Sequence, residues 1–393
     1  MRALCYIGTN KLNVESVNDP RILNPKDVIL KVALSSVCGS DLHFIHGFVP
    51  GMKEGDILGH EFAGEVVETG SAVTQLKKGD RVVVAPNISC GDCFYCSNGD
   101  YGLCDNSNPN GYMQEPLMGY PTAAFYGCSH MYGGYAGSHA EYVRVPYAEE
   151  GCFKIPPSLS YAQALFVSDA LSTGYMAADI AVKPGDVVVV WGAGAVGQMA
   201  MASAWLKGAS RVIAIDKYSY RLKLAIEKHQ VDAYNYEEVD LFEILKESTA
   251  GNGPDVCIDA VGMEANTTGI EDLYDKAKQK LHLQMDRPSV LRQAILSCRK
   301  GGTLSIIGVY SGLVDKFPIG PLMNKGITVK TGMVNAQKYI PALLKHIESG
   351  KLDPTYLKTH EWALEEGNDG YRFFGDNRNE CMRGVFLPNG NMQ

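Results

Sequence analysis

The segment VVVVWGAGAVGQMAMASAWLKGASRVIAID, residues 187–216, decides the fold of this chain. Five apolar residues at its start, Val187–Trp191, are typical of a fully buried parallel strand. A glycine motif of the form GxGxxG follows directly, and then a helix rich in small residues. A second apolar strand ends on Asp216. This order of strand, glycine turn, helix and strand predicts a Rossmann unit that binds a dinucleotide.

Each glycine of the motif has its own function in such a unit. Gly192 allows a sharp turn after the strand, and Gly194 lets the backbone approach a pyrophosphate. Gly197 lets the helix pack closely against the strand. The helix N-terminus around Val196 offers N–H groups and a partial positive charge to phosphates. A glycine-rich turn without a nucleotide is the alternative, and it leaves Asp216 unexplained.

Asp216 also indicates which nicotinamide cofactor is bound. Its carboxylate can accept hydrogen bonds from an adenosine ribose, and its charge would repel a 2′-phosphate. We therefore expect NAD rather than NADP. Lys217 and Arg221 weaken this preference without reversing it, and we place Arg221 among the cofactor-binding residues.

The overall composition limits the class of protein. The chain has 393 residues, 46% of them hydrophobic and 20% charged, which is enough for two domains. No run of 18 apolar residues is present, so we expect no membrane span. A net charge of −8 without a long basic run argues against nucleic acid as a partner. Eleven cysteines without a secretory signal indicate metal or thiol chemistry in a cytoplasmic protein.

Short strand-like runs, separated by glycine and proline, fill the chain as far as Asp169. They predict a small β-barrel or sandwich. The clearest runs are Val28–Leu34, Glu61–Thr69, Arg81–Ala85 and Ala140–Pro146.

Four cysteines lie close together inside this region, in a lobe of about residues 89–105. Cys90, Cys93, Cys96 and Cys104 fall within fifteen residues. Four thiolates without another ligand suit a closed tetrahedral zinc site that stiffens a loop. An iron–sulfur cluster and unliganded surface cysteines are the alternatives.

A second group of metal-binding residue types is scattered in the sequence. Cys38 lies in CGSDLH, and His60 precedes Glu61 in GHE. Three protein ligands with an open position would make a catalytic zinc site. A single cysteine or histidine is also common in a protein core, so both interpretations stay open at this point.

From residue 170 onward the pattern changes to alternating helices and apolar strands. This alternation predicts a doubly wound sheet with a ligand crevice at the carboxyl ends of its strands. A helix and a strand follow near the C-terminus, at Tyr339–Glu348 and Met382–Leu387. The apolar strands are Val187–Trp191, Arg211–Ile215, Val256–Ala260, Gly302–Gly308 and Ile327–Gly332.

With these motifs the whole chain resembles the zinc-dependent medium-chain alcohol dehydrogenase superfamily. The resemblance implies a Rossmann cofactor domain over residues 170–333. It also implies a GroES-like β-barrel catalytic domain made of residues 1–169 and 334–393, with the catalytic cleft between the two domains. The matching segments are Cys38–His43, Gly59–Glu61, Cys90–Cys104 and Gly192–Asp216.

Within the superfamily the chain is most similar to the glutathione-independent formaldehyde dehydrogenase branch. The similarity lies in Pro146–Pro156, in Ser168–Ala178 and in a long aromatic insertion over residues 105–139. It places Asp169 where better-known members carry a second cysteine, which implies that Asp169 is the third ligand of the catalytic zinc. A carboxylate is a harder ligand than a thiolate and leaves the metal more electrophilic. A cap for the following helix is the alternative for Asp169.

The resemblance also implies roles for neighbouring residues. Asp41 would hold His60 in one tautomer, and Glu61 would sit behind the metal. Ser40 and His43 would carry the substrate proton to solvent. Two further residues, Val261 and Val309, would lie near the nicotinamide.

We therefore expect an oxidoreductase with two zinc ions per chain that transfers a hydride from a primary alcohol or hydrated, formaldehyde-like aldehyde to NAD. Aldehyde dismutation is an extension of this activity. A polyol, secondary-alcohol or threonine dehydrogenase is the alternative, and a non-catalytic nucleotide-binding member is a remote one. We expect a homo-oligomer, with a tetramer favoured over a dimer.

Two insertions have no assigned chemistry. Residues 105–139 either line the substrate pocket or contact another subunit, and their His130 and His139 read as ordinary polar residues. Residues 263–288 read as a charged, helical surface insertion.

Overall fold

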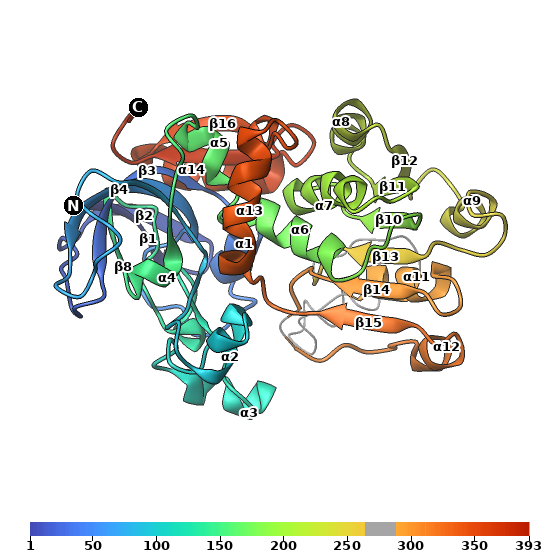
Figure 1. The fold of residues 1–393 in the computed structure, drawn as a ribbon, viewed down its shortest axis with the longest axis horizontal. Coiled ribbons are helices and arrows are strands. Elements are labelled where there is room, and N and C mark those ends of the chain that lie inside the picture. Colours follow the sequence, from blue (N-terminus) through green and yellow to red (C-terminus); the bar gives the residue numbers. More distant parts are fainter. Residues whose placement is uncertain (264–287, 311, 393) are drawn as a thin grey trace. The chain divides into compact units, whose positions relative to one another are not determined.

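The computed structural model describes residues 1–263, 288–310 and 312–392. It contains two compact units, and the first combines two separate parts of the sequence (Figure 1). Unit 1 consists of Met1–Ser172 and Val334–Gln393, and unit 2 of Thr173–Met333. The insertion expected at residues 263–288 lies, apart from its first and last residues, outside the described residues.

Unit 2 is a six-stranded parallel sheet in the order β12-β11-β10-β13-β14-β15. The first strand in sequence, β10, is therefore central, and the order of connection reverses between β10 and β13, as in a Rossmann fold. The strands are β10 (Val187–Trp191), β11 (Arg211–Asp216), β12 (Asp232–Asn235), β13 (Val256–Asp259), β14 (Thr303–Ile306) and β15 (Thr328–Thr331). Its helices are α7 (Ala195–Leu206), α8 (Ser219–His229), α9 (Leu241–Glu247), α11 (Ser289–Ser297) and α12 (Ile319–Asn324).

The apolar run of β10 is buried on both faces of the sheet. Val188 and Val190 pack against α7 and α8 on one face, whereas Val189 and Trp191 pack against α9 and α11 on the other. Side chains alternate between faces along a strand, so a continuous apolar run needs cover on both sides. The predicted Rossmann arrangement is confirmed, and the five predicted strands form with ends that shift by at most two residues. The sixth strand, β12, was not among those predicted.

Unit 1 is built around a seven-stranded sheet in the order β16-β17-β3-β4-β5-β9, with β8 also paired to β3. All of these pairs are antiparallel except β16 with β17. Its strands are β3 (Val28–Ser36), β4 (Glu61–Thr69), β5 (Arg81–Val84), β8 (Tyr142–Val145), β9 (Cys152–Lys154), β16 (Lys358–Ala363) and β17 (Arg383–Leu387). Two small sheets pair β1 (Arg2–Gly8) with β2 (Lys11–Ser16) and β6 (Asn87–Ile88) with β7 (Ala124–Phe125).

Helices in unit 1 are mostly short. Among them, α1 begins just after β3 and α6 continues across the boundary between the units. They are α1 (Gly39–Ile45), α2 (Phe94–Ser97), α3 (Glu115–Met118), α4 (Ala148–Gly151), α5 (Tyr161–Leu165), α6 (Ala170–Asp179), α13 (Ala336–Glu348) and α14 (Gly367–Asp376).

The last strand, β17, joins the sheet next to the first long strand of the unit. Val385 pairs with Ser36 and Phe386 with Ser35. Because the two strands are antiparallel, this register places the start of β17 beside the end of β3. Residues that are far apart in the sequence therefore meet at one end of this ladder.

Candidate active site and metal centres

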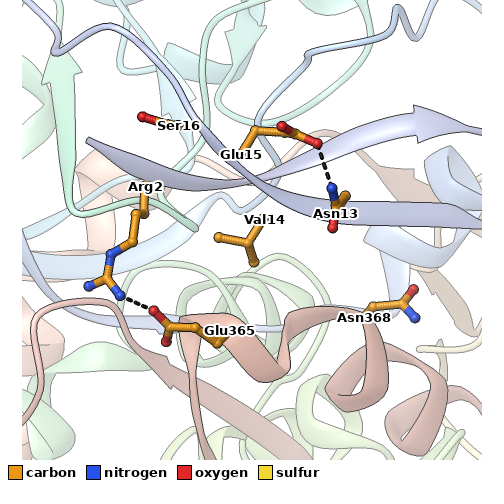
Figure 2. A pocket seen from close by; sticks show the side chains of 7 residues that line it. All are labelled: Arg2, Asn13, Val14, Glu15, Ser16, Glu365 and Asn368. Atoms are coloured by element: carbon orange, nitrogen blue, oxygen red, sulfur yellow. Dashed lines mark hydrogen bonds and ion pairs between the residues drawn. The ribbon is translucent and has the colours of Figure 1, made fainter.

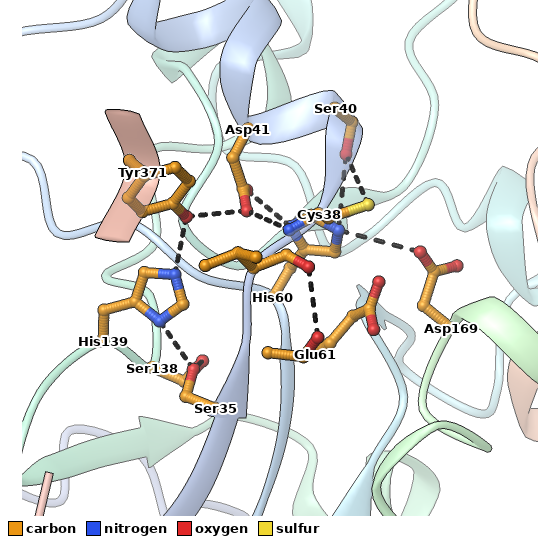
Figure 3. A network of polar contacts seen from close by, with 12 residues as sticks. Ser35, Cys38, Ser40, Asp41, His60, Glu61, Ser138, His139, Asp169 and Tyr371 are labelled. Carbon is orange, nitrogen blue, oxygen red and sulfur yellow. Dashed lines mark hydrogen bonds and ion pairs between the residues drawn. The ribbon is translucent and has the colours of Figure 1, made fainter. Parts of the chain in front are cut away.

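The residues expected to bind the catalytic zinc converge at the end of the β3–β4 ladder (Figure 3). Ser36 pairs with Glu61, so Cys38 beyond β3 and His60 just before β4 lie at the same end. Asp169 comes from the residue before α6. One ligand atom from each of Cys38, His60, Glu61 and Asp169 lies within 4.8 Å of the others.

The chemistry of this donor set fits a zinc ion. His60 Nδ1 lies 3.1 Å from Asp41 Oδ1, which leaves Nε2 as the nitrogen that faces the other ligands. That Nε2 is 3.7 Å from Asp169 Oδ2, a separation close to the edge of a coordination tetrahedron. A thiolate, an imidazole and a carboxylate, with the nearby Glu61, are all ordinary zinc ligands. Cys38, His60 and Asp169 would hold the ion.

The local electrostatics favour the ionised form of the sulfur ligand. Burial alone would raise the pKa of the Cys38 thiol, but the Arg383 guanidinium and His60 lower it to about 6. Burial also opposes ionisation of Asp41, yet His60 lowers the pKa of that carboxyl to about 2. The site is therefore arranged for a thiolate and a carboxylate near neutral pH.

Arg383 is a site residue that the sequence motifs did not reveal. It lies at the start of β17, is 3% exposed, and its Nη2 is 2.9 Å from Glu61 Oε1. Its Nη1 donates to the backbone carbonyl of Val37 at 2.5 Å. The one feature of the sequence that could have indicated its role was a charged residue at the start of the apolar strand MRGVFL. It supplies the positive charge that a buried Glu61 requires.

Ser40 and His43 lie on α1 next to these ligands. The Ser40 hydroxyl donates to Cys38 Sγ at 3.2 Å and is 3.4 Å from His60 Nε2. His43 is one turn further along the helix and is buried. The spacing of three residues places both side chains on one face of α1.

The four clustered cysteines form a second group with metal-ligand geometry. Their sulfur atoms lie within 4.8 Å of one another, and Cys93 Sγ is 4.0 Å from Cys104 Sγ. Zn–S bonds of about 2.3 Å give a tetrahedron with edges of about 3.8 Å. The backbone N–H of Cys93 donates to Cys90 Sγ at 3.3 Å. Cys90, Cys93, Cys96 and Cys104 therefore fit a structural zinc ion.

The glycine turn of unit 2 has the conformation that its motif requires. Gly192 has φ +89°, which favours glycine, and a Cβ on Gly197 would lie 1.7 Å from Gly192 O. A Cβ on Gly194 would make only an ordinary contact, with Arg221 at 3.6 Å. Val196, half-buried, lies in the first turn of α7.

Asp216 and Arg221 lie beside this turn. Asp216 accepts hydrogen bonds from the backbone N–H groups of Ala193, Lys217 and Tyr218. Arg221 Nη1 is 3.8 Å from Asp216 Oδ2. The carboxylate is thus fixed at the end of β11, next to the N-terminus of α7.

The backbone segments that follow β13 and β14 are hydrogen-bonded to each other near Val261 and Val309, the two remaining candidate cofactor-binding residues. Met263 N–H donates to Val309 O at 2.8 Å, and Val261 N–H donates to the buried Asp259 at 2.9 Å. Tyr310 also donates to Asp259. Val261 and Val309 therefore lie together at the carboxyl ends of these strands, where Rossmann folds bind ligands.

The aromatic insertion at residues 105–139 divides into a buried and an exposed part. Tyr126 is 1% exposed and packs edge-on against Phe62 at 5.2 Å, whereas Tyr112 and Tyr120 are 67% and 82% exposed. His139, expected to be an ordinary polar residue, is fully buried.

A separate pocket of unit 1 lies beside the β1–β2 hairpin (Figure 2). None of the predicted site residues lines it. Its wall consists of Arg2, Asn13, Val14, Glu15, Ser16, Glu365 and Asn368. Among the described residues, no helix has the length and apolar character needed to cross a membrane.

Comparisons with known proteins agree with these features. A family model described as an alcohol dehydrogenase GroES-like domain matches residues 24–157, and one described as a zinc-binding dehydrogenase matches residues 195–280. An uncharacterised zinc-type alcohol dehydrogenase-like protein of Bacillus subtilis is 41% identical over 99% of this chain and 100% of its own length.

Two further proteins are similar over most of their length. The glutathione-independent formaldehyde dehydrogenase of Pseudomonas aeruginosa is 33% identical over 88% of this chain and 87% of its own. The alcohol dehydrogenase TADH of Thermus sp. ATN1 has a TM-score of 0.84 at 33% identity, over 98% of this chain and 99% of its own.

Proposed function

Because this chain belongs to the zinc-type alcohol dehydrogenase family, with its GroES-like and Rossmann domains, we propose that it oxidises a primary alcohol or a small hydrated aldehyde with NAD. The observation that carries this proposal is the convergence of Cys38, His60 and Asp169 in unit 1. The similarity to a formaldehyde dehydrogenase supports a small aldehyde as substrate.

The residues around the site have separate proposed roles. When bound, zinc would supply Lewis acidity that lowers the pKa of a substrate hydroxyl, and NAD would accept the hydride. Ser40 would take the substrate proton, and His43 would pass it toward solvent; the contacts of Ser40 with Cys38 and His60 support this role. Arg383 lowers the pKa of the Cys38 thiol and pairs with Glu61.

For the cofactors, we propose two zinc ions per chain and NAD in preference to NADP. The two groups of ligands support the zinc count. The Asp216 carboxylate, fixed beside the start of α7, supports NAD because it would repel a 2′-phosphate. A kcat/KM higher with NADP than with NAD would contradict this assignment.

The experiment that tests the function combines metal analysis with assays of NADH formation. The purified protein is expected to hold two zinc ions and to reduce NAD with formaldehyde or short primary alcohols. If the protein oxidised only polyols or secondary alcohols, the proposed substrate class would be wrong. No activity on any of these compounds would overturn the function.

Substitution of the carboxylate ligand makes the assay specific to this site. Asp169→Asn is expected to lower kcat at least about 100-fold. Replacing a residue that only contacts a metal ligand already lowers metal affinity or activity about 10–100-fold, and Asp169 is itself a proposed ligand. Asp369→Asn is the matched control, because Asp369 lies on α14 in an exposed pair with Arg372. Equal activity of the Asp169 variant and this control would exclude Asp169 as a ligand.

We also propose a cytoplasmic homo-oligomer, a tetramer rather than a dimer. An open sheet edge and an exposed aromatic segment support an oligomer: β15, where Val329 is 39% exposed, and the insertion around Tyr112 and Tyr120. The eleven free cysteines support a reducing compartment.

A further inference from the structure

A line of buried side chains leads from the metal-binding histidine into the core of unit 1 (Figure 3). His60 Nδ1 is 3.1 Å from Asp41, and Asp41 accepts a hydrogen bond of 2.7 Å from the Tyr371 hydroxyl. That hydroxyl is 2.7 Å from His139 Nε2, and His139 Nδ1 is 2.7 Å from the Ser35 hydroxyl. All five residues are buried, with at most 3% of each exposed.

The direction of each hydrogen bond follows from the number of protons. Tyr371 has one proton and donates it to the Asp41 carboxylate, so its oxygen must accept from His139 Nε2–H. His139 Nδ1 then has no proton and accepts from Ser35. Ser35 in turn accepts from Ser138, whose hydroxyl is 2.7 Å away. Every donor therefore points toward Asp41, and such aligned bonds strengthen one another.

The ionisation states agree with this pattern. Burial lowers the pKa of His139 to about 4, so the imidazole is neutral and has one N–H to donate. Asp41 accepts a hydrogen bond from Tyr371 and faces His60 Nδ1 at 3.1 Å, so its position is fixed from two sides.

We propose that Tyr371 and His139 are positioning residues for the metal centre, acting on the ligand His60 through Asp41. Their hydrogen bonds hold the Asp41 carboxylate, and that carboxylate fixes the tautomer and orientation of His60 so that Nε2 faces the metal. This inference rests on the proposed function, because it assumes that His60 is a zinc ligand. The outer partners of a ligating histidine usually affect metal affinity or activity 10–100-fold.

Local packing supports a fixed position for this network. A Cβ on Gly59, the residue before His60, would lie 2.6 Å from the His139 ring, so the imidazole rests directly on this glycine. The His139 ring also packs edge-on against Phe386 at 4.8 Å. The residues come from β3, α14 and the segment before β8, so three parts of unit 1 converge on one zinc ligand.

Tyr371→Phe tests the proposal, because it removes only the hydroxyl. We expect a chelator to remove zinc from the Cys38 site about 10-fold faster than in the wild type. The four-cysteine zinc of the same chain should be unaffected and serves as the internal reference. Tyr161→Phe is the matched control, since Tyr161 is a buried tyrosine of unit 1 that packs against Arg81.

A spectroscopic measurement separates positioning from general destabilisation. With Co²⁺ in the Cys38 site, the visible absorption should shift in Tyr371→Phe and stay unchanged in Tyr161→Phe. His139→Gln should act in the same direction. Added to Tyr371→Phe, it should change the rate of zinc loss by less than about twofold, because the hydrogen-bonded path from His139 to Asp41 runs through the Tyr371 hydroxyl.

The outcomes distinguish the two proposals. A wild-type protein that retains only the four-cysteine zinc would overturn the proposed function and this inference with it. Two zinc ions in the wild type, with unchanged zinc loss and cobalt spectrum in Tyr371→Phe, would overturn this inference alone. If Tyr371→Phe does not fold, His139→Gln provides the same comparison.

Discussion

At the proposed zinc site, individual ionisable side chains are largely buried. Cys38, Glu61 and Asp169 bring a thiol and two carboxyl groups to one place. Burial raises the pKa of Glu61, and the paired Arg383 guanidinium opposes that rise. Removing one partner of a buried pair commonly costs about 3–5 kcal/mol, because the other charge is left without compensation. Arg383 therefore belongs to the site as much as the ligands do.

The neutral state of His139 gives the protein a pH-dependent stability. Its folded pKa of about 4 lies below the unfolded value of 6.5, so between these values the unfolded chain binds a proton that the folded chain does not. The stabilisation is complete above pH 6.5 and is lost as the pH falls toward 4. We expect His139 to account for a loss of about 2 kcal/mol between pH 7 and pH 5.

Urea unfolding of His139→Gln is the comparison for this prediction. The variant is less stable at pH 7, but it lacks the titrating group, so its stability should depend less on pH. Parallel curves for the variant and the wild type between pH 5 and pH 7 would show that His139 does not titrate in this way.

The sequence motifs predicted the proposed ligands but not the residues that support them. Cys38, His60 and Asp169 lie in or beside recognisable local segments. Arg383 and Tyr371 are more than 200 residues away from these ligands, and only the register of β17 against β3 and the packing of α14 bring them close. No local pattern contains that information.

Among the structural elements, the turn between β10 and α7 depends on Gly197, which has no space for a side chain. In Gly197→Ala the new Cβ would lie 1.7 Å from Gly192 O, a backbone atom that can move only with the turn. We expect a loss of at least about 2 kcal/mol in the stability of unit 2. Thermal unfolding followed by circular dichroism measures it.

Gly194→Ala is the matched control within the same motif. Its Cβ would meet only Arg221, at 3.6 Å, and its backbone has an ordinary φ of −70°. The variant should fold like the wild type and bind NAD more weakly, because the methyl group would occupy the proposed path of the pyrophosphate. Equal stability of both variants would contradict the steric argument.

The elements themselves were largely predictable. The apolar runs of unit 2 are long and unambiguous, and each forms the expected strand. The insertion at residues 105–139 was harder, because its aromatic residues have no period that separates Tyr126, inside the core, from Tyr120, at the surface. Tertiary packing decides between these two environments.

In the assembly of the whole protein, we expect the exposed strand β15 to contact another chain. It pairs only with β14 in the described part of the chain, and all of its residues are exposed. An open strand edge offers unpaired backbone N–H and C=O groups to another chain, and Val329 is the one apolar side chain of this edge. Val329→Lys should therefore reduce the molar mass in solution to that of a smaller species, as measured by light scattering.

Ile226→Lys is the control for this change. It introduces the same side chain at an exposed apolar position on α8, away from the sheet edge. We expect it to assemble like the wild type. A monomeric wild type would exclude the oligomer, and an unchanged mass of the Val329 variant would exclude β15 as the contact.

The divided sequence of unit 1 has a consequence for biosynthesis. Cys38, His60 and Asp169 leave the ribosome before unit 2, whereas Tyr371 and Arg383 are translated after it. The nascent chain therefore carries these three side chains for as long as unit 2 takes to be made, without Arg383 and Tyr371, which complete their surroundings. The surroundings of the proposed zinc site are complete only once β17 has emerged and paired with β3.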